Sequence, residues 1–198
     1  MKQHRVKSFI ILALIAVSSP AAAFAATANG STTISASLGS TITIATSGTV
    51  NLSLTPTVAG VMSSSSDSVD VATNNSTGYT LTLSNGDATT NLINGANTIA
   101  ADAGTQASPS SSLTNNRWGY RVDGIGGFGA GPTSAETNAT NSAFSWAGVP
   151  ALSAPNTIRT TSSPSGSSIT TVWYGVKADT SKPNGTYTDT VTYTATTN

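Results

Sequence analysis

The chain has 198 residues with eight Lys and Arg, eight Asp and Glu, one His and no Cys, so its formal net charge is zero and disulfides are excluded. The one histidine is at position 4, which excludes Ser-His-Asp and Cys-His catalysis and the usual zinc or copper ligand sets from the rest of the chain. Beyond position 26 five basic residues face eight acidic ones, a net charge of −3, which argues against nucleic-acid binding.

The first 26 residues have the pattern of a secretory signal peptide. Basic residues open the chain at Lys2, Arg5 and Lys7. The apolar run 9–17 (FIILALIAV) follows, and an alanine-rich exit over 21–26 fits cleavage after Ala25 or Ala26. The run is too short to span a bilayer comfortably, although a retained anchor is the alternative. We therefore expect a protein that is secreted or held at the cell surface, with no membrane span after removal of the signal.

The residues after the signal alternate between apolar and polar side chains. The runs 32–36 (TTISA), 40–45 (STITIA) and 50–54 each place alternate residues on one face, and Pro56 ends the last of them. We expect two or three strands here. The segment Thr27–Ala36 follows the predicted cleavage site directly, so we expect it to be able to add as a strand to the sheet edge of a neighbouring copy.

The next stretch alternates soft loops with short strands. Residues 59–68 contain four consecutive serines and predict a loop, whereas Val69–Ser84 predicts a hairpin around the turn cluster 74–78. Residues 88–116 are either a long loop or two short edge strands. We expect strands, because long unstructured loops are uncommon in compact domains. Residues 117–122 predict a strand with Trp118, Tyr120 and Val122 on one face.

A glycine-rich stretch follows this strand. Residues 124–129 match G-x-G-x-x-G, but Gly131-Pro132 and a polar stretch come next, where a dinucleotide site needs a helix. We therefore expect an inter-strand loop. Residues 133–136 have the spacing of a capping box without an apolar stripe behind them, which allows at most one helical turn.

The end of the chain, 170–196, gives the strongest strand signal. Two alternating runs flank the turn Lys182–Gly185 and predict a final hairpin. Their inward faces carry Val172, Tyr174, Val176 and Ala178, and then Tyr187, Val191, Tyr193 and Ala195. Trp173 and Lys177 lie on the opposite face. We expect Lys177 to be a solvated strand lysine and Trp173 to point outward or to pack against a covering loop.

These elements predict an all-β fold. Nine or ten short strands with frequent turns favour a single antiparallel β-sandwich domain over residues 27–198, of immunoglobulin-like or Greek-key type, with a barrel as the alternative. No motif indicates a cofactor or a metal, because the aspartates near turns lack a calcium-loop spacing and no carboxylate pair stands out. Among the aromatic residues, Trp173 and Trp118 are the best candidates for contact with a ligand or partner.

Four segments resemble known surface proteins. They are 69–83 (VDVATNNSTGYTLTL), 118–122 (WGYRV), 146–150 (WAGVP) and 172–194 (VWYGVKADTSKPNGTYTDTVTYT). All four resemble a recurrent exported domain of Saccharibacteria-type bacteria, and the first and last are also similar, more distantly, to the sandwich core of WxL-type cell-wall proteins. The resemblance implies an exported sandwich at the cell surface. The Trp-x-Leu signature itself is absent, since Val191-Thr192-Tyr193 stands where it is expected.

Together these features predict a secreted or cell-surface structural or adhesive protein that is not an enzyme. Without an LPxTG motif or an apolar tail in the sequence, we expect it to be released, bound non-covalently or assembled into a polymer of its own copies. A small carbohydrate-binding or cell-wall-binding module, with a glycan or surface protein as its partner, is the alternative.

Overall fold

The computed structural model describes residues 26–198, and the predicted signal peptide falls almost entirely outside the described residues. The chain divides into two units, residues 1–37 and Leu38–Asn198. Residues 26–37 are exposed and have no regular secondary structure, so the strand predicted over 32–36 is not formed. A lone strand leaves its backbone hydrogen-bonding groups without partners, which accounts for the difference.

Within Leu38–Asn198 the described residues form nine strands. They are β1 (Ile42–Ala45), β2 (Val61–Thr73), β3 (Tyr79–Asn85), β4 (Leu92–Asn94), β5 (Asn97–Ala101), β6 (Arg117–Arg121), β7 (Asn156–Thr160), β8 (Ile169–Ala178) and β9 (Val191–Thr197). Across residues 26–198 there is no helix, and hence none of the length and apolarity needed to cross a membrane.

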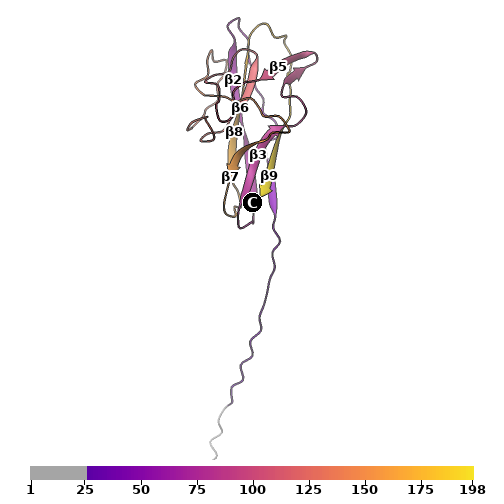
Figure 1. Cartoon of the computed structure of the whole chain (residues 1–198), viewed down its shortest axis with the longest axis vertical. Coiled ribbons are helices and arrows are strands. Elements are labelled where there is room, and N and C mark those ends of the chain that lie inside the picture. The colour runs from indigo at the N-terminus through magenta and orange to yellow at the C-terminus, as the bar shows by residue number, and fades with distance from the viewer. Residues whose placement is uncertain (1–25) are drawn as a thin grey trace, which may run out of the picture. The chain divides into compact units, whose positions relative to one another are not determined.

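The strands form two sheets of unequal size. The larger sheet has the order β1-β2-β8-β6-β5-β4, and the smaller has the order β7-β3-β9. Neighbours are antiparallel except β5 and β6, which are parallel. Figure 1 shows β7, β3 and β9 toward the end of the domain where the C-terminus lies, and β5 and β6 toward the other end. The fold is therefore all-β and sandwich-like, as the sequence predicts.

Both sheets contribute buried side chains to one core. The cluster includes Val69, Val71, Tyr79, Leu81, Leu83, Trp118, Tyr120, Ile158, Val172, Tyr174 and Val176. The alternation predicted for the inward face of β8 and for residues 117–122 is confirmed, because these side chains are buried. Alternate residues of a strand point to one side of a sheet, so the period of two identifies the core face correctly.

Both predicted hairpins are wrong. The strands that flank the turn at 74–78 belong to different sheets, as do those that flank Lys182–Gly185. Each connection is an arch that carries the chain across the core, so the two apolar faces oppose each other instead of lying side by side. Periodicity in the sequence is the same in either arrangement, which is why the pattern cannot separate them.

The predicted loop at 59–68 is wrong from Val61 onward, because residues 61–68 belong to the longest strand, β2. This strand pairs with β8 from Val61 to Asp70. Its serines are held by other segments: Ser63 Oγ donates to Ser53 O at 2.7 Å, and Ser64 Oγ accepts from Glu136 N at 2.9 Å. Tertiary hydrogen bonds thus override the weak strand preference of serine.

Other expectations fare unevenly. The two short strands expected within 88–116 are present as β4 and β5, and the glycine-rich stretch after β6 is a loop. Between residues 27 and 54 only β1 forms, fewer than the two or three strands expected. Strand β7 is not predicted by the sequence pattern, because Ile158 is its single buried apolar residue and a lone apolar residue gives no period.

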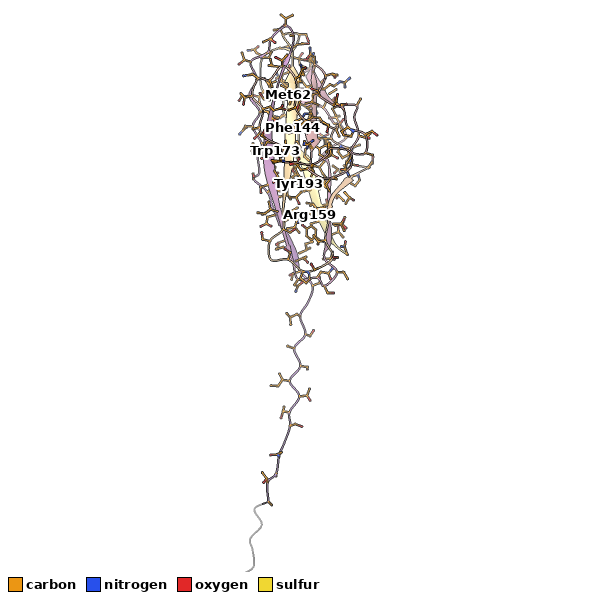
Figure 2. All side chains as sticks on the ribbon, turned by 90° about the vertical axis from the view of Figure 1, so that its left-hand side faces the viewer. Met62, Phe144, Arg159, Trp173 and Tyr193 are labelled. Atoms are coloured by element: carbon orange, nitrogen blue, oxygen red, sulfur yellow. The ribbon has the colours of Figure 1, made fainter. Side chains whose placement is uncertain are left out.

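A layer of loops covers the outer face of the larger sheet. Met62, Leu113 and Trp146 form a second buried cluster there, with Phe144 and Trp173 packed against it (Figure 2). The expectation that Lys177 is solvated is wrong. Its side chain is 8% exposed and its Nζ donates to Thr140 O at 2.9 Å, because this loop layer lies over it.

Candidate interaction groove

An open groove lies beside the core on the inner face of the larger sheet. Its volume is about 1040 Å³. One wall is formed by residues from Ile44 to Pro56, the opposite wall by residues from Thr180 to Tyr193, and the floor by Trp118, Tyr174, Val176 and Ala178. Interiors of folded domains are close-packed, so a void of this size beside the core marks a place where packing is incomplete.

The first wall begins at the end of β1, and beyond Ala45 it is a segment that belongs to neither sheet. Val50, Leu52 and Leu54 are partly buried against the core and alternate with exposed residues, as the sequence predicts. In the described structure residues 49–54 make no backbone–backbone hydrogen bonds, and Ser53 O accepts only from the hydroxyl of Ser63. This segment therefore shows the alternating burial of a strand, but its backbone is not paired with another segment.

The second wall leads along the chain into β9, and it also has a backbone edge without a partner strand. Thr188 exchanges both backbone hydrogen bonds with Ile93, at 2.9 and 3.0 Å, and Thr190 O accepts from Gly86 N at 2.7 Å. Just after β9, Asn198 N donates to Gly78 O at 3.2 Å, so the residue that bonds in this direction is again an even-numbered one. The even-numbered residues thus bond toward β3 and β4.

The backbone groups of the odd-numbered residues of this wall point the other way. In an antiparallel ladder, alternate residues direct their N–H and C=O groups to opposite edges. Those of Tyr187, Asp189, Val191 and Tyr193 therefore face the edge beside the groove. Within residues 26–198 no strand pairs with this edge.

A polar contact joins the floor of the groove to its second wall, and thereby joins the two sheets. The hydroxyl groups of Tyr174 on β8 and Tyr193 on β9 are 2.6 Å apart. Burial raises the pKa of both hydroxyls well above the usual range, and the nearby charge of Asp67 raises them further. Asp67 is itself held by Ser47 N at 2.8 Å. The two hydroxyls therefore serve each other as hydrogen-bond partners and link β8 to β9.

The two tryptophans predicted as contact residues occupy different layers. Trp118 is 3% exposed, its Nε1 donates to Thr90 O at 2.8 Å, and its ring lies at the floor of the groove. Trp173 is partly buried and packs against the loop layer on the other side of the sheet. The structure therefore does not bring them into one site, and only Trp118 borders the groove.

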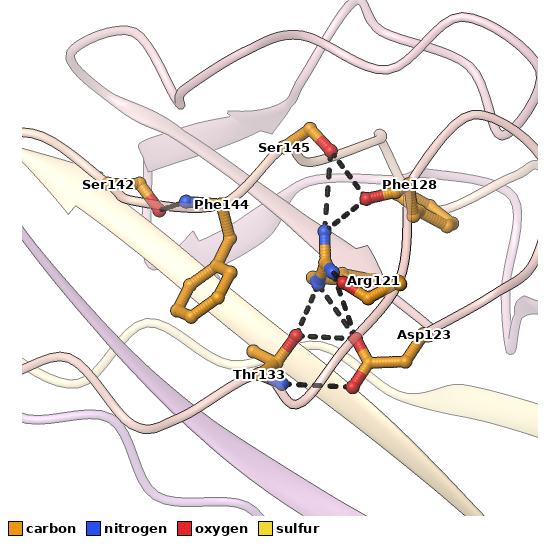
Figure 3. Close-up of polar contacts among 8 residues, drawn as sticks. Arg121, Asp123, Phe128, Thr133, Ser142, Phe144 and Ser145 are labelled. Carbon is orange, nitrogen blue, oxygen red and sulfur yellow. Dashed lines mark hydrogen bonds and ion pairs between the residues drawn. The ribbon is translucent and has the colours of Figure 1, made fainter.

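Arg121 forms the densest polar cluster of the domain (Figure 3). The side chain is 2% exposed, and its Nη2 lies 3.0 Å from Asp123 Oδ1. Its guanidinium also donates to Thr133 Oγ1, to Phe128 O at 2.6 Å and to Ala130 O at 3.3 Å, and it lies 5.1 Å from the centre of the Phe144 ring. The partners are all loop residues, so this cluster fixes the loop layer and leaves no donor for a ligand.

The pKa of Asp123 is lowered although its partial burial acts to raise it. Hydrogen bonds from Thr133 and the positive charge of Arg121 outweigh the loss of solvation.

Within the described residues there is no group of three or more His, Cys, Asp or Glu side chains able to hold a metal ion. The groove is therefore the feature of this domain with the clearest capacity to bind another molecule.

The scan against protein-family models finds no match, and the searches of curated proteins and of solved structures find none either.

The sequence predicts the apolar sides of the two groove walls, but it does not predict the groove. The alternation at 50–54 and at 187–193 correctly marks the apolar side of each wall. Sequence reasoning missed that both segments lack a strand partner, because alternation in the second segment is equally typical of a hairpin strand. The absence of any turn pattern that returns the chain beside 50–54 is the one signal that could have indicated it.

Proposed function

We propose that this protein is an exported structural or adhesive component of the cell surface, without catalytic activity, whose copies assemble through strand addition. The observation that carries the proposal is that one chain contains both an open groove, bordered by unpaired backbone edges, and an exposed alternating segment near its start. Strand addition gives affinity through backbone hydrogen bonds and specificity through pockets for alternate side chains.

Export is supported by the signal-peptide pattern of the first 26 residues and by the low charge of the remainder. The exposed segment is supported as a donor by its apolar side chains. Ile34 is 91% exposed and Leu38 is 83% exposed. Burial of an aliphatic side chain of this size contributes about 1.5–3 kcal/mol, so a partner surface for both side chains would stabilise an assembly.

The test is light scattering coupled to size-exclusion chromatography on protein that begins at Thr27. We expect species whose mass grows with protein concentration. Removal of Thr27–Ala36 should abolish them, and Ile34→Asp should weaken them strongly. Val58→Asp serves as the matched control, because Val58 is 85% exposed and lies outside the segment. Self-association that survives the deletion unchanged would overturn the proposal.

A glycan-binding module is the second candidate, favoured by one observation. The groove is bordered by Trp118, Tyr174, Tyr187 and Tyr193, and aromatic rings stack readily on sugar rings. Such a module is expected to be monomeric and to change its tryptophan fluorescence with a matching glycan. Fluorescence that stays unchanged across a panel of cell-wall glycans would count against it.

A further inference from the structure

We infer that the acceptor for the exposed segment is the groove beside β9, and that its occupant is the segment Thr32–Leu38 of a second copy of this chain. This inference rests on the proposed function, since it names the site at which strand addition takes place. The free sheet edges elsewhere are those of β1 and β7, because Thr188 already bonds to the outer edge of β4, and several features distinguish the groove from these two edges.

The unequal sheets indicate where a strand is missing. Six strands of one sheet face only three of the other, and the smaller sheet ends at β9. Beside this end the inner face of β8, from Tyr174 to Ala178, borders the groove instead of a fourth strand. An added strand next to β9 would extend the smaller sheet over that uncovered face.

The backbone of the groove is prepared for a strand on both sides. The open edge over 187–193 presents alternate N–H and C=O groups, and residues 49–54 make no backbone–backbone bonds of their own. An incoming strand would therefore meet unpaired backbone groups on both walls. Most free sheet edges offer a partner on one side only, so the groove would satisfy more of the incoming backbone than β1 or β7 would.

The length of the segment matches the length of the edge. Residues 32–38 and residues 187–193 each comprise seven positions, and seven residues of strand span about 23 Å. Residue 39 is already fixed in the domain, because Gly39 O accepts from Asn74 Nδ2 at 2.8 Å. The exposed segment therefore ends at residue 38, after the seven positions that equal the length of the open edge.

The side chains of the segment also fit a groove with one apolar side. Thr32, Ile34, Ala36 and Leu38 share one face, and the other face carries only Thr33, Ser35 and Ser37. With the first face turned inward, Ile34 and Leu38 would contact the floor formed by Val176 and Ala178. The second face would lie in solvent beside the exposed threonines of β9, such as Thr192. Small polar residues there continue the character of that surface.

The test uses engineered cysteines, for which the chain has no background because it contains no Cys. Thr33→Cys, Ser35→Cys and Ser37→Cys are each mixed with a second protein that carries Thr192→Cys on β9. The matched control carries Thr160→Cys, an exposed threonine on β7 at the other edge of the same sheet. Side chains on one face of neighbouring strands lie about 4.5–5.5 Å apart, within reach of a disulfide after a small adjustment.

We expect at least one of the three donor variants to form an intermolecular disulfide with the Thr192→Cys protein, and none to do so with the Thr160→Cys protein. Mass spectrometry of the cross-linked dimer identifies the pair. Polymers that persist while the β7 control cross-links equally, or while β9 does not cross-link, would overturn this inference and leave the proposed function standing. A protein that remains monomeric under all conditions would instead refute the proposed function.

Discussion

Asp179 and its neighbours connect the two walls of the groove. Asp179 follows β8 directly, and its carboxylate accepts hydrogen bonds from Ser181 N at 2.9 Å, Asn116 Nδ2 at 3.1 Å and Asn115 Nδ2 at 3.1 Å. The neighbouring Thr180 N donates to Thr57 O at 3.2 Å. This network ties the end of one wall to the end of the other. The hydrogen bonds lower the pKa of Asp179 to about 2.

This lowered pKa predicts a pH-dependent stability. A carboxyl whose pKa is lower in the folded than in the unfolded state stabilises the fold above the unfolded value, and the contribution is lost as pH falls through the folded value. We therefore expect the stabilising effect of Asp179 to be complete at about pH 6 and to disappear between about pH 4 and pH 2. Asp179→Asn should lower the unfolding temperature at about pH 6 and converge with the parent near pH 2.

Thermal unfolding monitored by circular dichroism at a series of pH values measures this difference. Asp87→Asn is a useful control, because Asp87 is also a turn aspartate, but its carboxylate accepts hydrogen bonds from Thr89 alone and not from the network around Asp179. Two curves for Asp179→Asn and the parent that stay parallel across this whole acidic range would contradict the role given to this carboxylate.

At the residue scale the sequence predicts burial better than it predicts polar contacts. The inward positions of β8 and the face of Trp118, Tyr120 and Val122 follow from alternation alone. The burial of Arg121 and Lys177 does not, because it depends on how loops fold over them: the loop that follows β6 for Arg121, and the distant residue Thr140 for Lys177. Backbone carbonyls satisfy much of their hydrogen bonding, and a carbonyl group carries no signature in the sequence.

At the scale of elements, alternation identifies most strands but not their partners. The chain arches between sheets after both β2 and β8, where turn-forming residues are equally typical of hairpins. A turn cluster allows reversal of the chain in either geometry, and only the packing of the core selects one. The same reasoning explains β2, whose serines gain hydrogen bonds from the loop layer that no local pattern reveals.

The loop layer packs on β8 through a close approach at Gly175. A Cβ atom at this position would lie 2.9 Å from two ring atoms of Trp146, which is itself fully buried. We expect Gly175→Ala to lower the free energy of unfolding by about 1–3 kcal/mol, because overpacking forces the ring or the strand to shift. Denaturant unfolding and the emission of the tryptophans measure the effect.

Gly166→Ala is the matched control for this substitution. A Cβ atom added at Gly166 would have no neighbouring atom within 4 Å, and the backbone there does not require glycine. The control is expected to change stability by less than about 0.5 kcal/mol. Equal losses in the two variants would mean that the contact between Trp146 and β8 is not what holds the loop layer in place.

At the scale of the whole molecule the all-β class is predictable, and the incompleteness of the sandwich is not. Composition, missing cysteines and the period of two lead to a two-sheet fold. The unequal sheets and the groove depend on which strands pair, and pairing over long sequence separations is not encoded in any single segment. Within residues 26–198 Ile34 and Leu38 are exposed, and in the proposed assembly a second molecule covers them.

A competition experiment on the protein that begins at Thr27 tests the proposed strand addition most directly. A synthetic peptide of residues 27–38 (TANGSTTISASL) carries the segment but has no groove of its own, so it should act as a chain stopper. Light scattering is expected to show an average mass that falls as the peptide is added. A control peptide with Ser in place of Ile34 and Leu38 should have little effect. An average mass that the first peptide leaves unchanged at large excess, or a protein that never assembles, would contradict the account.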